Sequence, residues 1–242
     1  MQFAEKVCLV TGGASGIGRA TCEMMAARGG RVAVVDIDDV GGEAVARGIT
    51  AAGGEAVFLR ADVSAPGDAR AAVEAVAARW GRIDVLVNNA AVMTFEPVVA
   101  LAEEDWRRLF DVNVFSMFLL CKYALPHMKG GAVVNVSSVH AHQTVPNVVP
   151  YAASKGAVEA FTRGLSAECA GAGTRVNCVA PGAVDTPMLW SNPNLKSGVE
   201  KLTGPVADPR DLAAAICFLA SDESRSINGS TVVVDNGQLR NL

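Results

Sequence analysis

The chain has 242 residues, half of them hydrophobic, and a formal net charge of −4 at pH 7. This composition disfavours disorder, and the small negative charge disfavours an electrostatic contact with nucleic acid. The length fits one large α/β domain or two small ones, and no spacer divides the chain. We therefore expect one domain over residues 1–242 and a small soluble molecule as its partner.

Apolar runs such as VCLV and AVVNV are far shorter than the roughly 20 residues needed to cross a bilayer. The amino terminus carries no evident signal peptide. Six cysteines are scattered without a C-x-x-C pair, mostly in apolar stretches. We expect them to be reduced core residues of a cytoplasmic protein with no membrane partner.

Short β-branched runs alternate with longer Ala-rich segments. In chain order we expect a strand in KVCLVTG, a helix near 16–28, a strand in RVAVVD, a helix near 39–52, a strand in EAVFLRAD and a helix near 65–80. A strand in IDVLVNNA, a helix near 103–128, a strand in GAVVNVSS, a helix near 151–170 and strands in TRVNCVAPG and STVVVD follow. This alternation predicts an α/β, doubly wound, Rossmann-like parallel sheet of about seven strands flanked by helices. Functional groups should lie at the carboxyl ends of the strands.

Residues 185–207, DTPMLWSNPNLKSGVEKLTGPVA, lack clear periodicity. Structureless loops longer than about 12–15 residues are uncommon unless they have a function. We therefore expect a substrate loop or lid here, with a plain surface loop as the alternative.

The stretch TGGASGIG, residues 11–18, follows the first strand and leads into a helix, with Gly12, Gly16 and Gly18 in a G-x-x-x-G-x-G spacing. Glycines at these positions let backbone amides and a helix N-terminus approach a pyrophosphate. The spacing departs from G-x-G-x-x-G, and a glycine-rich turn alone is often only a turn.

Asp36 ends the second strand, 18 residues beyond Gly18. A carboxylate there can accept hydrogen bonds from both adenosine ribose hydroxyls and would repel a 2′-phosphate, which favours NAD over NADP. Alternatively, Asp36 only caps the next helix, a role that Asp38 or Asp39 would fill better.

Polar side chains gather at the predicted carboxyl edge of the sheet: Asn88, Asn89, Asn113, Ser138, Tyr151 and Lys155. Tyr151 and Lys155 are four residues apart and share one helix face. A free tyrosine has a pKa of about 10, and a nearby ammonium lowers it by favouring the phenolate. Tyr151 is therefore a candidate acid and base. An isolated Y-x-x-x-K can be an exposed pair, but Ser138 thirteen residues upstream and the glycine loop favour catalysis.

With these motifs, and with APG at 180–182 and VDNG at 234–237, the chain resembles the short-chain dehydrogenases/reductases over essentially its full length. The resemblance implies Tyr151 as acid/base, Lys155 as its activator, Ser138 as the substrate-oriented hydroxyl and Asn113 in a proton relay. It implies cofactor contacts from Gly12, Ser15, Gly16, Ile17, Gly18, Asp36, Asp62, Val63, Asn89, Tyr151, Lys155, Pro181, Gly182, Val184 and Thr186. It also suggests a homotetramer formed through the helices near 103–128 and 151–170. Ala91 and Ser226 depart from the residues common in the family, and neither touches the reacting groups.

His140, His142, Gln143 and Asn147 follow the fifth strand and would make a substrate-pocket wall polar, which suits a sugar or polyol. No Cys, Asp or Glu lies close in sequence to complete a ligand set with the two histidines, so we expect no metal.

The sequence thus predicts a single dinucleotide-binding and catalytic domain that transfers hydride between NAD and a secondary alcohol or ketone. A 3-oxoacyl-carrier-protein reductase is the closest alternative, and Asp36 argues mildly against it because such biosynthetic reductases often use NADPH. A non-catalytic dinucleotide-binding regulator would not need Asn113, Ser138, Tyr151 and Lys155 together. A sugar-nucleotide epimerase would need a separate substrate domain.

Overall fold

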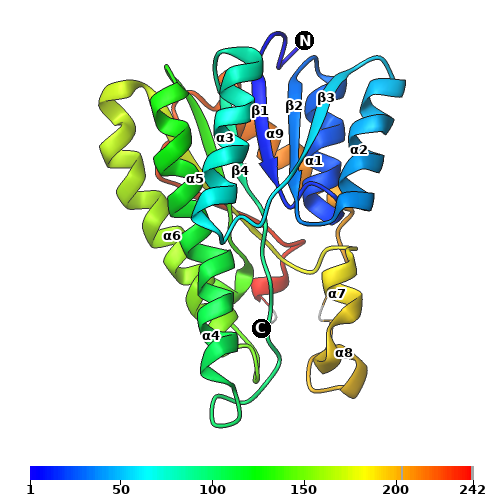
Figure 1. Cartoon of the computed structure of the whole chain (residues 1–242). Helices are drawn as coiled ribbons and strands as arrows, with labels where there is room; N and C mark the ends of the chain where they lie inside the picture. The colour runs from blue at the N-terminus through cyan, green and yellow to red at the C-terminus, as the bar shows by residue number, and fades with distance from the viewer. Residues whose placement is uncertain (203, 241–242) are drawn as a thin grey trace.

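One parallel sheet organises the molecule, shown as a computed structural model that describes residues 1–202 and 204–240 (Figure 1). Its seven strands lie in the order β3-β2-β1-β4-β5-β6-β7. Their bounds are β1 Val7–Thr11, β2 Arg31–Asp36, β3 Glu55–Arg60, β4 Val85–Asn88, β5 Gly131–Val136, β6 Thr174–Pro181 and β7 Thr231–Val234. The strand order reverses between β1 and β4, which opens a crevice at their carboxyl ends. The predicted doubly wound fold is confirmed.

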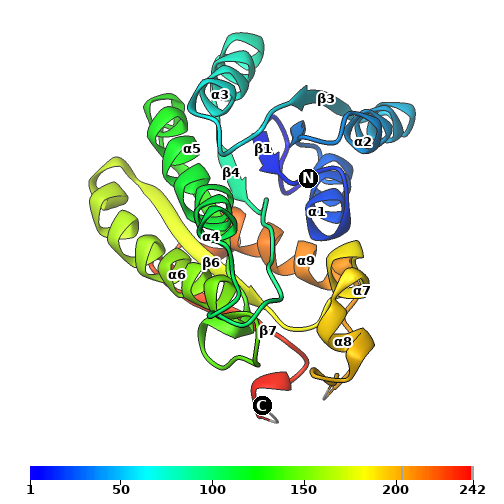
Figure 2. The ribbon, with the colours of Figure 1, turned by 60° about the horizontal axis from the view of Figure 1, so that its bottom comes forward.

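Helices cover both faces of the sheet (Figure 2). One face packs against α1 (Gly16–Ala27), α2 (Asp39–Ala51) and α9 (Pro209–Ala220). The other packs against α3 (Pro66–Trp80), α5 (Ser116–Ala124) and α6 (Val149–Cys169). Because most strands are buried on both sides, they appear in the sequence as continuous apolar runs rather than alternating ones. Helix α9 is an addition to the elements expected from the sequence.

The helix expected near 103–128 is divided. It consists of α4 (Glu103–Phe110), a π-helical turn η1 (Asp111–Phe115), α5 and a 3-10 turn η2 (Leu125–His127). π-helical turns are rare and often mark functional sites, and this one contains Asn113. By length and composition alone the stretch Glu103–His127 could cross a membrane, although 44% of its apolar window is buried in the fold.

The segment 185–207 contains two short helices, α7 (Pro187–Ser191) and α8 (Pro193–Ser197). A parallel bridge between Val184 and Ala207 joins its two ends. Together with α4, this segment extends beyond the carboxyl edge of the sheet (Figure 1). Short 3-10 turns complete the described chain: η3 Val139–Ala141, η4 Ala170–Ala172, η5 Asp222–Ser224 and η6 Gln238–Arg240.

All six cysteines are buried and unpaired, which fits their expected place in the core. Burial raises the pKa of the Cys121, Cys178 and Cys217 thiols to about 12. These thiols therefore stay protonated at neutral pH and pack as small hydrophobic groups.

Candidate active site

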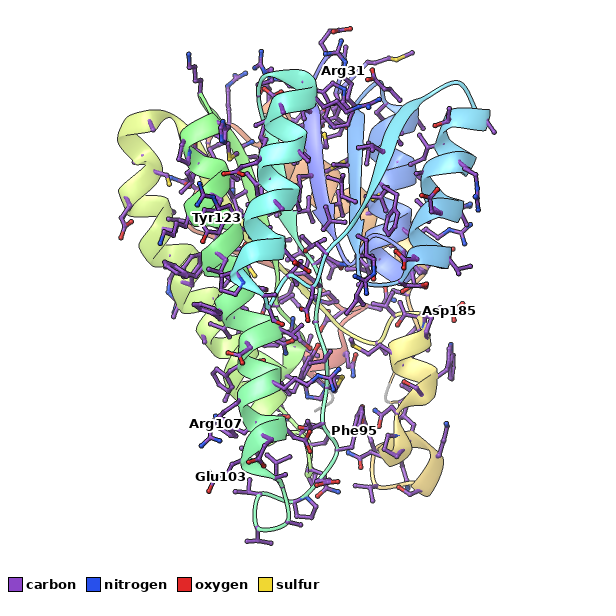
Figure 3. The ribbon with its side chains drawn as sticks, viewed as in Figure 1. Arg31, Phe95, Glu103, Arg107, Tyr123 and Asp185 are labelled. Atoms are coloured by element: carbon purple, nitrogen blue, oxygen red, sulfur yellow. The ribbon has the colours of Figure 1, made fainter. Side chains whose placement is uncertain are left out.

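The carboxyl ends of the strands open into a cavity of about 390 Å³. Most of the residues expected at the site line it: Gly12, Ser15, Gly16, Ile17, Asp36, Asp62, Val63, Asn89, Ser138, His140, Tyr151, Lys155, Pro181, Gly182, Val184 and Thr186. Helix α4 and the α7–α8 segment, which begins near Asp185, contribute walls beyond the sheet (Figure 3). Groups far apart in the sequence thus meet around one space.

The turn between β1 and α1 allows close approach of another molecule. Gly12 and Gly16 have φ angles of +64° and +51°, a region that favours glycine. A Cβ on Gly16 would lie 2.9 Å from Cγ2 of Thr186, and one on Gly12 would lie 2.7 Å from Nδ2 of Asn89. Side chains would therefore fill the cradle, and their absence fits a pyrophosphate at the N-terminus of α1.

Gly18 differs from the other two glycines of the turn because it does not line the cavity. A Cβ on Gly18 would lie 2.0 Å from the carbonyl oxygen of Gly12. Gly18 therefore permits α1 to pack against the turn, and its direct contact with a cofactor stays a prediction.

Asp36 is held in place at the end of β2. Its Oδ2 accepts a hydrogen bond from the amide of Ala14 at 2.9 Å, and its Oδ1 accepts one from the amide of Asp38 at 3.1 Å. Each carboxylate oxygen keeps further accepting capacity. Asp38, rather than Asp36, caps the next helix, because its Oδ1 accepts hydrogen bonds from the amides of Val40 and Gly41 at 3.1 Å each.

Tyr151 and Lys155 lie one turn apart on α6, with exposed fractions of only 7% and 2%. The Lys155 ammonium is 5.4 Å from the centre of the Tyr151 ring and donates a hydrogen bond to the Val136 carbonyl at 2.9 Å. Burial raises the pKa of Tyr151 to about 12, and the hydrogen bond with Ser138 lowers it in part. Burial lowers the pKa of Lys155 to about 8.

These directions differ from the expectation that Lys155 brings the pKa of Tyr151 down. Both groups have lost water, and desolvation disfavours the charged form of each. In the protein alone, this loss outweighs the attraction between an ammonium and a phenolate.

Ser138 and His140 place polar atoms beside the tyrosine. Ser138 Oγ accepts a hydrogen bond from the His140 amide at 3.2 Å. The His140 ring meets the Tyr151 ring edge-on with centroids 5.8 Å apart, and its Nδ1 lies 2.9 Å from the Thr144 hydroxyl. Burial lowers the pKa of His140, opposed by the charge of Glu200. His140 is therefore an uncharged polar group at neutral pH.

Asn113 lies outside the cavity wall, in contrast to Ser138, Tyr151 and Lys155. Its Oδ1 accepts from the Val92 amide at 2.8 Å, and its Nδ2 donates to the Val92 carbonyl and to Ser154 Oγ, each at 3.0 Å. Both amide hydrogens are therefore used to join the loop after β4 to α6. A part for Asn113 in a proton relay stays a prediction.

His142 and Asn147 were candidates for the substrate-pocket wall, and the structure places both elsewhere. His142 Nε2 lies 3.1 Å from Glu159 Oε1, a buried carboxylate on α6. Asn147 Nδ2 faces Asn194 Oδ1 at 3.5 Å. Gln143 is also outside the cavity lining, so that of the four side chains expected at this wall only His140 lines the cavity.

Sequence reasoning misses several residues that line the cavity. From beyond the sheet these include Arg108, Met188, Leu189, Asn192, Glu200 and Gln238. Asn192 Nδ2 donates to Glu200 Oε2 at 2.8 Å, so the two form one polar wall. Met188, Leu189, Asn192 and Glu200 belong to the segment 185–207, which has no clear periodicity in the sequence. The Thr-Pro and Asn-Pro pairs there are typical of helix starts, and they are its main signal for the two short helices.

No group of three or more His, Cys, Asp or Glu side chains could hold a metal ion within the part of the chain that the structure describes. The expectation of no metal rests on the sequence argument. The described residues bring three features around one cavity: the glycine turn that fits a pyrophosphate, the carboxylate of Asp36 at the end of β2, and the buried phenol and amine of Tyr151 and Lys155. This arrangement defines a dinucleotide-dependent oxidoreductase.

Comparisons with known proteins agree with this class. Residues 12–238 match the family model described as enoyl-(acyl carrier protein) reductase. The chain is 38% identical to a cyclopentanol dehydrogenase of Comamonas sp., covering 98% of both chains, and 40% identical to a D-threitol dehydrogenase of Mycolicibacterium smegmatis, covering 96% of this chain and 92% of that one. A short-chain dehydrogenase of Burkholderia cenocepacia in complex with NADP superposes with a TM-score of 0.93 at 32% identity, over 99% of this chain and all of that one.

The chain belongs to the short-chain dehydrogenase/reductase family, whose members bind a nicotinamide dinucleotide.

Proposed function

We propose that this protein is an NAD-dependent dehydrogenase that acts on a secondary alcohol or ketone, and that its substrate carries further hydroxyl groups, as a polyol or sugar does. The observation that carries the proposal is that Ser138, Tyr151 and Lys155 line the same cavity as Asp36 and the glycine turn. A regulator that only binds a dinucleotide would not need these groups together. The similarity to dehydrogenases of a ring alcohol and of a polyol supports this substrate class.

The chemistry follows from the positions of three side chains. A bound nicotinamide would accept the hydride. Tyr151 takes the hydroxyl proton of the alcohol, and Ser138 donates a hydrogen bond to the same oxygen. Lys155, held by the Val136 carbonyl at 2.9 Å, stabilises the phenolate. To act near pH 7, a phenol whose pKa burial raises to about 12 needs roughly 7 kcal/mol of differential stabilisation in the working complex.

The preference for NAD rests on charge around Asp36. Among the described residues that line the cavity, the only Lys and Arg are Lys155, in the catalytic pair, and Arg108, on α4. The nearby Arg60 pairs with Asp39 at 3.2 Å. A 2′-phosphate beside Asp36 would therefore be repelled by a fixed carboxylate, and neither Lys155 nor Arg108 lies at the end of β2 to compensate its charge. Because the similar Burkholderia cenocepacia dehydrogenase is in complex with NADP, family membership alone does not decide between the two cofactors, and the charge at Asp36 is the feature to test.

The substrate side of the cavity combines polar and apolar walls. His140, Asn192 and Glu200 supply hydrogen-bonding groups, whereas Met93 and Leu189 supply apolar surface. Hydroxyl groups of a compact polyol or ring alcohol can satisfy the first set while its carbons pack on the second. The long acyl chain of a 3-oxoacyl thioester would leave the polar groups less well paired.

We also infer a homotetramer in the cytoplasm, without membrane or nucleic-acid partners. Phe115 and Phe118 on the outer side of the η1–α5 segment stack at 5.9 Å and remain 39% and 43% exposed. Val149 at the start of α6 is also exposed. Covering such aromatic surface stabilises subunit contacts. Light scattering of the purified protein measures the assembly, and a monomer would contradict it.

The function is tested by turnover of the purified protein. NAD and NADP are each offered with cyclic secondary alcohols, tetritols and sugars, and NADH and NADPH with 3-oxoacyl thioesters. We expect NAD-dependent oxidation of a polyol or ring alcohol. Activity on the thioesters alone would transfer the assignment to the reductase, and cofactor binding without turnover would favour the regulator.

A further inference from the structure

A buried carboxylate lies directly behind the catalytic pair. Glu159 is on α6, one turn after Lys155 and two turns after Tyr151, so the three residues share a helix face in a Y-x-x-x-K-x-x-x-E pattern. Only 7% of Glu159 is exposed. A buried carboxylate is costly unless hydrogen bonds compensate it, and an apolar residue would fill this place at lower cost.

Glu159 is bonded from two other elements. Its Oε1 lies 3.1 Å from Oγ of Ser137, at the end of β5, and 3.1 Å from Nε2 of His142, in the loop after η3. Ser137 Oγ also lies 3.0 Å from the Lys155 carbonyl. We call Ser137, His142 and Glu159 the Glu159 cluster. It joins a strand end, a loop and a helix at one buried point.

The position of Ser137 in the chain links this cluster to catalysis. It stands between Val136, whose carbonyl accepts the Lys155 hydrogen bond, and Ser138, whose hydroxyl faces Tyr151. Neighbouring residues in a chain cannot move independently, so a shift of Ser137 displaces both contacts. Its amide also donates to the Val179 carbonyl at 2.8 Å, which fixes it to β6.

We propose that Glu159, with Ser137 and His142, is a positioning residue that holds Ser138 and the Val136 carbonyl in register with Tyr151 and Lys155. The inference rests on the proposed oxidoreductase function. Glu159 touches neither substrate nor cofactor, because it lies outside the cavity wall. Its effect is on the geometry of the proton transfer, where a displacement of about 1 Å can cost roughly 100-fold in rate.

The test compares Glu159→Leu, Glu159→Gln and Ser137→Ala with the wild type on an alcohol that the wild type oxidises. Glu159→Leu removes the carboxylate acceptor and leaves Ser137 the Lys155 carbonyl at 3.0 Å, whereas Glu159→Gln keeps a side-chain oxygen for Ser137. Glu168→Leu is the matched control, because Glu168 is exposed on the same helix. We expect Glu159→Leu and Ser137→Ala to lower kcat about tenfold or more, with the dissociation constant of NAD changed less than twofold, and Glu159→Gln to restore most of kcat.

Hydrogen exchange of the cofactor-free protein gives a readout independent of turnover. Glu159→Leu should speed exchange at residues 136–142 with little change in the other strands. A folded Glu159→Leu protein with wild-type kcat and exchange would overturn the proposal, as would an equal loss of kcat in Glu168→Leu. If Glu159→Leu does not fold, Ser137→Ala decides by the same criteria. Absence of wild-type turnover on any alcohol would instead count against the proposed function.

Discussion

Replacing Asp36 by Asn should reverse much of the proposed preference for NAD. The amide keeps an oxygen for the Ala14 amide, now bonded to the carboxylate at 2.9 Å, but removes the charge. Two unit charges about 4 Å apart interact by about 4 kcal/mol at an effective dielectric constant of about 20, and by about 1 kcal/mol in water. Because Asp36 is half-buried, we expect its repulsion of a 2′-phosphate to be about 2–3 kcal/mol, a factor of roughly 30 to 150.

The assay is the ratio of kcat/KM for NADP to that for NAD with one alcohol. Asp36→Asn should raise this ratio at least about 30-fold, mainly through KM for NADP. Glu43→Gln is the matched control, because it removes the same charge from an exposed residue of α2 that does not line the cavity and leaves the Arg60–Asp39 pair intact. An unchanged ratio in Asp36→Asn would refute the reasoning, since another group would then discriminate at the ribose.

Three further predictions follow from the same geometry. Tyr151→Phe should keep NAD affinity within about threefold and lose at least about 99% of turnover, because one general acid/base contributes about 100- to 10,000-fold to the rate. Substantial residual turnover in stopped assays would show that Tyr151 is not the general acid/base. The chain has two tyrosines, so the ultraviolet difference between wild type and Tyr151→Phe isolates one phenol from Tyr123. Burial favours the neutral form of this phenol and raises its pKa to about 12, so in the protein alone it should stay protonated as the pH rises past 10. Ionisation at or below pH 10 would contradict the burial argument. Gly18→Ala, whose Cβ would lie 2.0 Å from the Gly12 carbonyl, should lower stability by about 1–3 kcal/mol and weaken NAD binding. Gly48→Ala, with nothing within 4 Å, should raise stability by about 0.5–1 kcal/mol in the same denaturant titrations, and equal effects of the two changes would argue against the close packing.

The fold was predictable because its strongest forces leave local signals. Strands buried on both faces require continuous apolar runs, and the β1–α1 turn requires glycine at φ +64° and +51°. Helix α9 gave less signal: its run LAAAICFLA is apolar at nearly every position, so no helical stripe stands out, although Asp208 and Pro209 are typical of a helix start.

The place of Tyr151, Lys155 and Asp36 around one cavity was predictable, because each stands in a short motif at the carboxyl edge of the sheet. The candidate site was less predictable where the direction of a loop decides. His140 and His142 are two residues apart, yet one lines the cavity and the other pairs with Glu159. No periodicity specifies which way a side chain points from a loop, because that depends on long-range contacts. In the sequence, Glu159 has the pattern of an ordinary charged residue on a helix surface. Its burial depends on the packing of α6 beside the end of β5, which no local pattern specifies.

Burial acts on the two groups of the catalytic pair in opposite senses. Burial raises the pKa of Tyr151 to about 12 and lowers the pKa of Lys155 to about 8, so in the protein alone it favours the neutral phenol and the neutral amine. Proton transfer to and from an alcohol requires the reverse, a phenolate beside a retained ammonium. Contacts that favour the ammonium therefore matter as much as the tyrosine, and the Val136 carbonyl at 2.9 Å is one of them. Because Ser137 follows Val136 directly, the proposed role of Glu159 is to keep this carbonyl in place beside Lys155.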